Sequence, residues 1–269
     1  MRSLWLICAV ISIGCGELSN LRDAYEGITE RFVVSAVYVG VEDREDVDLT
    51  EIGLSTQVTS YLSDAAEISE VNNGSLSGLD VQLTTGSFGQ SSFVDVGDGQ
   101  YELDAFDGLA YTPAESAIIE AVYQGTKRSI SVKTPVTADV DVYPIVEVGD
   151  PVIVDLNGQG FDAMLVVLID VESASVVYSN EPSDVVGLIE MTHPYGYHLS
   201  SHDESGLDMV VEVPGEAIDR AGTYLLGVAG LNLSDPASYQ DINILLSSFM
   251  AGRFTFVRLC TPQWESACE

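Results

Sequence analysis

The chain has 269 residues, of which 46% are hydrophobic, so it has enough apolar material for large cores and is not predicted to be disordered. Its formal net charge is −32, with 42 acidic residues against 10 basic ones. This excess argues against nucleic-acid binding, which depends on neutralisation of phosphates by Lys and Arg. It also argues against attachment to anionic lipid through a basic surface.

The N-terminal stretch has the features of an export signal in the usual order: Arg2, an uncharged apolar run over residues 4–13, then Gly14 and Cys15. The run is shorter than the roughly 20 residues that a transmembrane helix needs. These residues resemble the lipobox of bacterial lipoproteins, with Ser12 where leucine is commonest. The resemblance implies cleavage of residues 1–14 and attachment of a diacylglyceryl group and a further acyl chain, such as palmitate, to Cys15. An ordinary cleaved secretory peptide is the alternative.

The residue after the lipobox cysteine is Gly16 and not aspartate. By analogy with enteric lipoproteins, this implies sorting to the outer membrane of a bacterial cell envelope. Residues 15–30 are predicted to be the lipidated cysteine and a tether, which includes apolar residues at the spacing of a short helix: Leu18, Leu21, Tyr25 and Ile28.

Short apolar runs separated by turn signals follow the tether. Residues 31–40 are β-branched and aromatic, which predicts a strand buried on both faces. Gly97-Asp98-Gly99 predicts a β-hairpin, because the two glycines supply the positive φ of a tight reversal. A second hairpin is predicted around Gln124-Gly125, and a further short strand over residues 136–142.

Pro144 and Pro151 bracket the strongest internal boundary, after which a second series of strands begins. The run over residues 163–169 is the most apolar of the mature chain and predicts an interior strand. Strand-length runs recur about every ten residues without long helical periodicity, which is typical of β-sandwiches. The predicted fold is therefore all-β, with two tandem antiparallel β-sandwich domains over residues 31–144 and 145–259 and a C-terminal tail over residues 260–269. The remaining predicted strands of the second series are residues 152–156, 176–178, 185–191, 209–213, 224–231, 242–246 and 253–259.

Each half contains a glycine followed two residues later by a tyrosine that opens a strand, Tyr101 and Tyr224. Residues 211–226 resemble the E-to-F region of immunoglobulin-like domains, where Asp, Ala or Gly, and Tyr precede a core strand. The resemblance implies that the Tyr224 hydroxyl bonds to nearby backbone at a sheet corner. One extra residue lies between Asp219 and Tyr224, and Leu226 occupies the position of the antibody-type cysteine, so no inter-sheet disulfide is implied.

Four cysteines are present. The resemblance to lipoproteins implies that Cys8 is removed with the signal and that Cys15 takes the lipid, which leaves Cys260 and Cys268 in an exported chain. A disulfide between them is predicted. Two free or metal-binding thiols are the alternative.

All three histidines fall in one segment over residues 193–203, and imidazoles beside a carboxylate suit zinc or copper. Pro194 and Gly196 argue against a regular helix there, so a polar surface loop is the alternative. The candidate metal ligands are His193, His198, His202 and Asp203.

Calcium is the other metal to consider, because carboxylates are abundant. Neither residues 95–107 nor residues 42–51 follow the spacing of an EF-hand loop. Four acidic residues flank the internal boundary, where an ion could stiffen the junction of the two domains: Asp139, Asp141, Glu147 and Asp150.

No catalytic motif is found: Leu76 stands where a Gly-x-Ser-x-Gly motif needs serine, and no His-Glu-x-x-His occurs. We therefore expect a non-catalytic, lipid-anchored envelope protein without an obligatory cofactor, which binds a protein or carbohydrate partner. Tyr195 and Tyr197 are candidate contacts with such a partner. The alternative is a metal-dependent envelope enzyme or metal-binding protein that uses residues 193–203.

Overall fold

The computed structural model describes residues 30–41, 49–50, 54–180, 209–244 and 246–268. Short 3-10 helices connect some of the strands: η1 (Ile68–Asn73), η2 (Ala105–Asp107), η4 (Gly215–Ala217), η5 (Pro236–Ser238) and η6 (Pro262–Ala267). The strands are β1 (Phe32–Gly40), β2 (Gln57–Asp64), β3 (Val81–Thr85), β4 (Gly89–Ser92), β5 (Val94–Gly97), β6 (Gln100–Asp104), β7 (Ser116–Tyr123), β8 (Thr126–Lys133), β9 (Val152–Asp155), β10 (Ala163–Asp170), β11 (Ser175–Ser179), β12 (Val210–Val213), β13 (Thr223–Leu233) and β14 (Ser248–Cys260).

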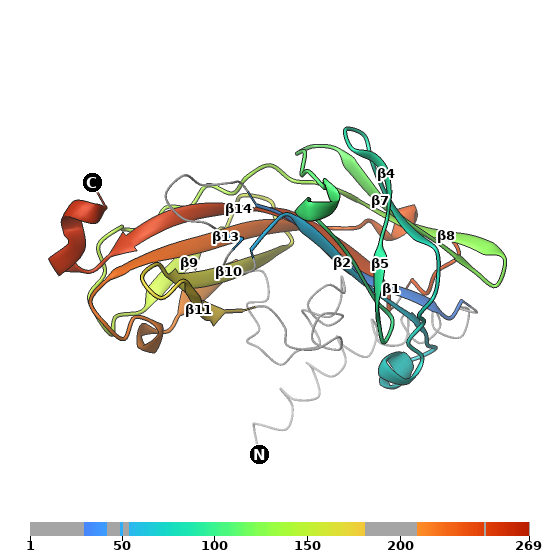
Figure 1. Cartoon of the computed structure of the whole chain (residues 1–269), viewed down its shortest axis with the longest axis horizontal. Coiled ribbons are helices and arrows are strands. Elements are labelled where there is room, and N and C mark those ends of the chain that lie inside the picture. Colours follow the sequence, from blue (N-terminus) through green and yellow to red (C-terminus); the bar gives the residue numbers. More distant parts are fainter. Residues whose placement is uncertain (1–29, 42–48, 51–53, 181–208, 245, 269) are drawn as a thin grey trace, which may run out of the picture.

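One long sheet runs through the whole described molecule (Figure 1). Its 8 strands lie in the order β11-β10-β13-β14-β1-β2-β6-β5. A 4-stranded sheet, β4-β3-β7-β8, and a 2-stranded sheet, β12-β9, make up the rest. We call the 8-stranded sheet the main sheet.

The main sheet contains strands from both predicted domains because β14 pairs on both of its sides. Strand β13 is antiparallel to β14 over almost its whole length, from Thr223↔Cys260 to Leu233↔Met250. On the other side, β1 is parallel to the first part of β14, from Ser35↔Ser248 to Gly40↔Arg253. The β1–β14 pair therefore joins the strands of the second series to those of the first.

The first core lies where the main sheet faces the 4-stranded sheet. Strand β1 contributes alternate residues to this core, as the period of two in a strand requires. The 4-stranded sheet supplies Leu83 and Ile119, which are almost fully buried. The cluster also includes Phe32, Val34, Ala36, Tyr38, Leu62, Tyr101, Ile130, Ile242 and Phe249.

The second core lies where the other half of the main sheet faces β9 and β12. The strand over residues 163–169, predicted from its apolar run, is β10, and all its residues are buried. Met164, Val166 and Leu168 point into the second core. The alternate residues on β10, Leu165, Val167 and Ile169, belong to a different cluster together with Phe254. The predicted all-β class is thus confirmed, with two successive sandwich cores.

The predicted domain limits, 31–144 and 145–259, do not coincide with these cores. Ile242 and Phe249 come from the second range but pack in the first core. Ala138 comes from the first range but packs in the second core, with Val140 and Val142 against it. The physical reason is that β14 is long enough to contribute residues to both cores. Residues from each half of the sequence therefore pack in the core formed mainly by the other half.

Two predicted strands are wrong. Residues 136–142 form no strand: side chains fix this segment instead, since the Gln159 amide donates to Asp139 O at 2.6 Å and its carbonyl accepts from Asp139 N at 2.8 Å. The described residues of 242–246 are turns and irregular structure. There Asn243 Nδ2 donates to Ala65 O at 3.2 Å, and Asn243 N donates to Phe32 O at 2.7 Å.

Both predicted hairpins are confirmed, as β5–β6 and β7–β8. Positive φ occurs at Gly97 (102°), Asp98 (50°) and Gly99 (81°), as a tight reversal of the chain demands. At Gly99 a side chain would also clash, because its Cβ would lie 2.6 Å from Leu62 O. This position therefore needs glycine for two independent reasons.

Candidate interaction surface at the disulfide-closed end

Several segments that are distant in sequence meet at one end of the main sheet, where β10 ends, β13 begins and β14 ends (Figure 1). Asp170 is opposite Tyr224, and Thr223 is opposite Cys260. Residue Ile145 forms a parallel bridge with Cys260. We call this region the disulfide-closed end: the tips of these strands, residues 143–146, residues 219–222 and η6.

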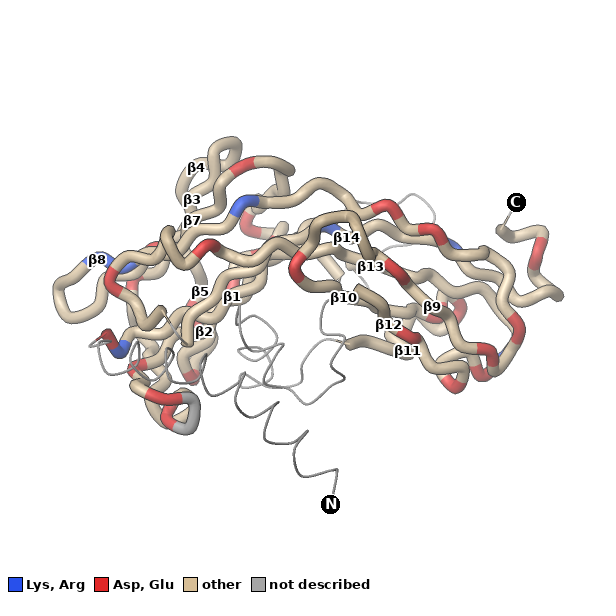
Figure 2. The backbone as a smooth tube through the Cα atoms, turned by 180° about the vertical axis from the view of Figure 1, so that it is seen from behind, with Lys and Arg blue, Asp and Glu red and all other residues tan. Residues whose placement is uncertain are grey.

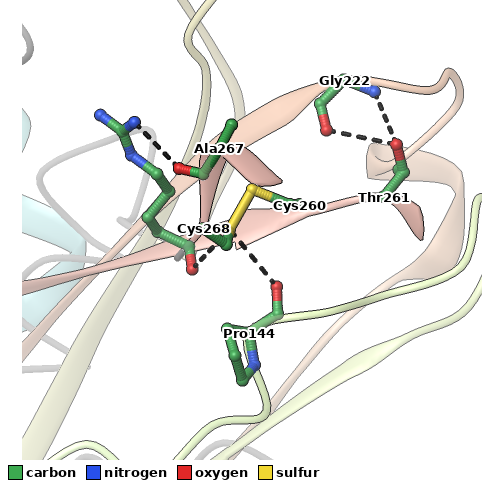
Figure 3. The surroundings of a disulfide bond; sticks show 7 residues. Pro144, Gly222, Cys260, Thr261, Ala267 and Cys268 are labelled. Atoms are coloured by element: carbon green, nitrogen blue, oxygen red, sulfur yellow. Dashed lines mark hydrogen bonds between the residues drawn. A yellow bond between two sulfur atoms is a disulfide. The ribbon is translucent and has the colours of Figure 1, made fainter. Parts of the chain in front are cut away.

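A disulfide joins Cys260 to Cys268, as predicted, and folds η6 back onto the end of β14 (Figure 3). Backbone hydrogen bonds hold the neighbouring segment against it: Cys260 N donates to Pro144 O at 2.8 Å, and Val146 N donates to Cys260 O at 2.9 Å. The Cys268 Sγ atom also lies 3.8 Å from Pro144 O. The tail is therefore tied both to its own strand and to the segment at the predicted boundary.

Thr261 links the start of η6 to the loop before β13 through hydrogen bonds. Its buried hydroxyl accepts a hydrogen bond from Gly222 N at 2.9 Å and donates to Gly222 O at 3.3 Å (Figure 3). The backbone Thr261 N also donates to Gly222 O, at 3.0 Å. A buried hydroxyl without partners would cost free energy, so this pairing favours one arrangement of the two loops.

Tyr224 forms the predicted corner. Its side chain is only 1% exposed, and its hydroxyl donates to Arg220 O at 2.9 Å, four residues upstream. Burial raises the pKa of this hydroxyl. Tyr101, which follows a glycine at the same spacing in the first half, is also buried. Its hydroxyl, however, donates to Leu76 O at 2.9 Å, which is 25 residues upstream. Only the second tyrosine therefore has the local corner geometry.

Asp170 and Arg220 form a partly buried ion pair beside this corner. The Asp170 carboxylate also accepts backbone N–H bonds from Glu172 at 2.9 Å and Ser173 at 3.2 Å. Burial acts to raise the pKa of Asp170, but the guanidinium and the two N–H groups together hold that pKa below its usual value. The hydrogen bonds that this carboxylate can accept are supplied by Arg220 and by the loop that follows Asp170, as is typical of a structural residue.

Two large aromatic side chains are exposed on this rigid frame. Tyr143 is 75% exposed, and Trp264, within η6, is 48% exposed. Exposed Tyr and Trp held on a fixed backbone are typical of protein contact sites, because they bury much area and lose little conformational entropy on binding. Neither was singled out from the sequence. Their signals were the position of Trp264 between the bonded cysteines and of Tyr143 beside Pro144.

The other predicted site residues have different outcomes. Cys15 lies outside the described residues, as do Tyr195, Tyr197 and the candidate metal ligands His193, His198, His202 and Asp203, so these assignments stay predictions. The four acidic residues at the internal boundary are all exposed. Within the described part of the chain, no group of three or more His, Cys, Asp or Glu side chains is placed to hold a metal ion. No helix there is long and apolar enough to span a membrane.

Comparison with protein-family models and with curated proteins gives no match. Solved structures that align with the chain include a chimeric titin Z1Z2 functionalised with a decorin peptide, at 12% identity and a TM-score of 0.27, covering 84% of this chain and 97% of that one. The BSP domain of a biofilm-associated protein aligns at 10% identity and a TM-score of 0.25, covering 86% and 30%. A segment of two fibronectin type III domains from chicken tenascin aligns at 10% identity and a TM-score of 0.22, covering 77% and 93%. At TM-scores this low, these likenesses carry no argument about the function of this chain.

We predict that Tyr224→Phe lowers the free energy of unfolding of the whole chain by about 1–2 kcal/mol, because Arg220 O loses its partner. Tyr224→Ala also removes the ring and leaves a cavity, which should cost about 3–5 kcal/mol. Tyr143→Phe is the matched control, since Tyr143 is exposed, and should change stability by less than about 0.5 kcal/mol. Denaturant unfolding measures all three, and equal effects of the two Phe variants would contradict the corner.

Proposed function

We propose that this protein is a non-catalytic, lipid-anchored component of the bacterial cell envelope, which uses its disulfide-closed end to bind a partner. The observation that carries the binding part is the exposure of Tyr143 and Trp264 on a frame held by the disulfide and by Pro144. Such aromatic anchors contribute most to binding when their backbone is already fixed in the free protein.

The strand order supports the choice of this end. Strand β1, the first element after the predicted tether, runs parallel to β14. The described chain therefore begins at the end of the main sheet opposite to Cys260. Strand β14 has 13 residues, so at about 3.3 Å per residue the two ends are about 40 Å apart. The fold thus separates the first described residues of the chain from the exposed aromatics by the length of β14.

The charge supports attachment by acyl chains and not by the protein surface. Acidic positions are spread over both sandwiches and basic positions are few (Figure 2). With a net charge of −32, the protein would be repelled from anionic headgroups. Acyl chains on Cys15 contribute about 0.8 kcal/mol per buried methylene, and two or more chains suffice for stable anchoring.

We predict that Cys15→Ser releases the protein from the membrane, because the variant cannot carry the thioether-linked lipid. Fractionation of cells followed by a carbonate wash measures this, with the unchanged chain as the control. A variant that still sediments with membranes after the wash would contradict the lipid anchor.

The binding end can be tested by placing a photo-crosslinking amino acid at position 264 in cells. We expect discrete crosslinked species from this position. The matched control is position 106, because Phe106 is 82% exposed but lies after β6, away from the disulfide-closed end. Identical crosslinking patterns from both positions, or none from position 264, would contradict the assignment of this end as the binding surface.

A further inference from the structure

The parallel β1–β14 pair has a mechanical consequence. The chain enters β1 at Phe32, beyond the position of Ser248, and leaves β14 at Cys260, at the opposite end of the sheet. A pull on both ends of the chain therefore slides β1 and β14 past each other along their length. In this shear geometry the ladder hydrogen bonds resist together, whereas a pull across the strands opens them one after another.

Charged and aromatic groups fix the beginning of β1. Arg31 binds Asp64 at 2.5 Å and Glu70 at 3.0 Å. Glu30 binds the guanidinium of Arg128, at 2.8 Å.

Arg128 itself is only 9% exposed, and its guanidinium lies 5.3 Å from the Phe32 ring centroid and 5.6 Å from that of Tyr123. Ion pairs and cation–π contacts are stronger in such a desolvated position. We call these residues the Arg128 cluster; they oppose peeling of β1 from its first residue.

The ladder between the two strands is shielded by packing on both faces. On β1, Val34 and Ala36 are buried in the first core, while Val33 is buried in a separate cluster on the opposite face. On β14, Phe249 and Met250 are buried in different clusters. Water has no ready access to replace these hydrogen bonds while the packing is intact.

At the disulfide-closed end, the disulfide connects η6, which carries the exposed Trp264, to β14 by covalent bonds. A force applied beyond Cys268 passes through the sulfur atoms to Cys260 and does not have to unfold η6 first. A partner bound at Trp264 would pull on a loop that is closed by this bond. The disulfide thus transmits force directly into the strand that is paired with β1.

We propose that the protein bears tension between its membrane anchor and a bound partner, and that the β1–β14 pair, with the Arg128 cluster, is the element that resists it. This proposal rests on the proposed function for the source of the force, namely an anchor at one end and a partner at the other. It adds a physical property that the proposed function does not require.

Single-molecule pulling on the exported chain carrying Cys15→Ser tests the proposal without lipid or partner. One handle is placed at the N-terminus, and the second is placed either after the last residue or on Val96→Cys. Val96 lies on β5 next to the turn at Gly99, and Gly99 O accepts from Leu62 N at 2.8 Å, opposite Val34. The Val96 attachment is therefore at the same end of the sheet as Phe32 and pulls across the strands.

We expect the terminal attachment to give a several-fold higher unfolding force than the Val96 attachment at the same pulling speed. Equal or lower force would overturn the proposal. Arg31→Gln should lower the force for the terminal attachment, whereas Lys127→Gln, which breaks an exposed ion pair with Glu120, should not. Equal losses with both variants would overturn the role of the Arg128 cluster. Since no membrane is used, these outcomes are independent of whether Cys15→Ser releases the protein from cells.

Discussion

The parallel pairing of β1 with β14 is the contact on which the rest of the architecture depends. Without it the main sheet would divide into strands β11-β10-β13-β14 and β1-β2-β6-β5. Strands β1 and β14 are separated by most of the sequence, so their pairing carries a cost in loop-closure entropy. In return, one sheet supports two cores, and Phe249 and Leu259 on the same strand belong to different cores.

The scarcity of cations makes their placement informative. Only 10 of the 269 residues are Lys or Arg, against 42 acidic residues. Three arginines lie at the two ends of the main sheet: Arg31 and Arg128 at the start of β1, and Arg220 at the disulfide-closed end, where it binds Asp170. The surrounding negative charge favours solubility and repels anionic surfaces, while these few pairs fix the ends of the sheet.

Local features of the fold could be predicted from the sequence. The apolar run of β10, the glycines of the β5–β6 turn and the cysteines of the tail each act over a few residues, and all were identified correctly. The corner at Tyr224 was implied by the resemblance of residues 211–226 to immunoglobulin-like domains, and it too is local, since its partner, Arg220 O, is only four residues away.

Features that depend on distant residues could not be predicted. The β1–β14 pairing cannot be recognised from a short stretch of sequence, because parallel strands are not joined by a tight turn. Residues 136–142 have the alternating pattern of a strand because alternate side chains pack in the second core. They pair with no neighbouring strand, so the pattern alone led to a wrong prediction. The exposure of Tyr143 and Trp264 depends on where Pro144 meets Cys260, which is a contact between distant segments. The lipid anchor and the histidine segment stay predictions.

The most direct test of one sheet shared by two cores is calorimetric unfolding of the exported chain with one truncation in each core. Leu83→Ala affects the first core and Leu156→Ala the second, and both side chains are fully buried, so each should cost about 2–5 kcal/mol. If the shared sheet couples the cores, a single transition is expected, with equal calorimetric and van't Hoff enthalpies, and both variants lower its temperature. Two transitions, of which each variant shifts only one, would contradict the account.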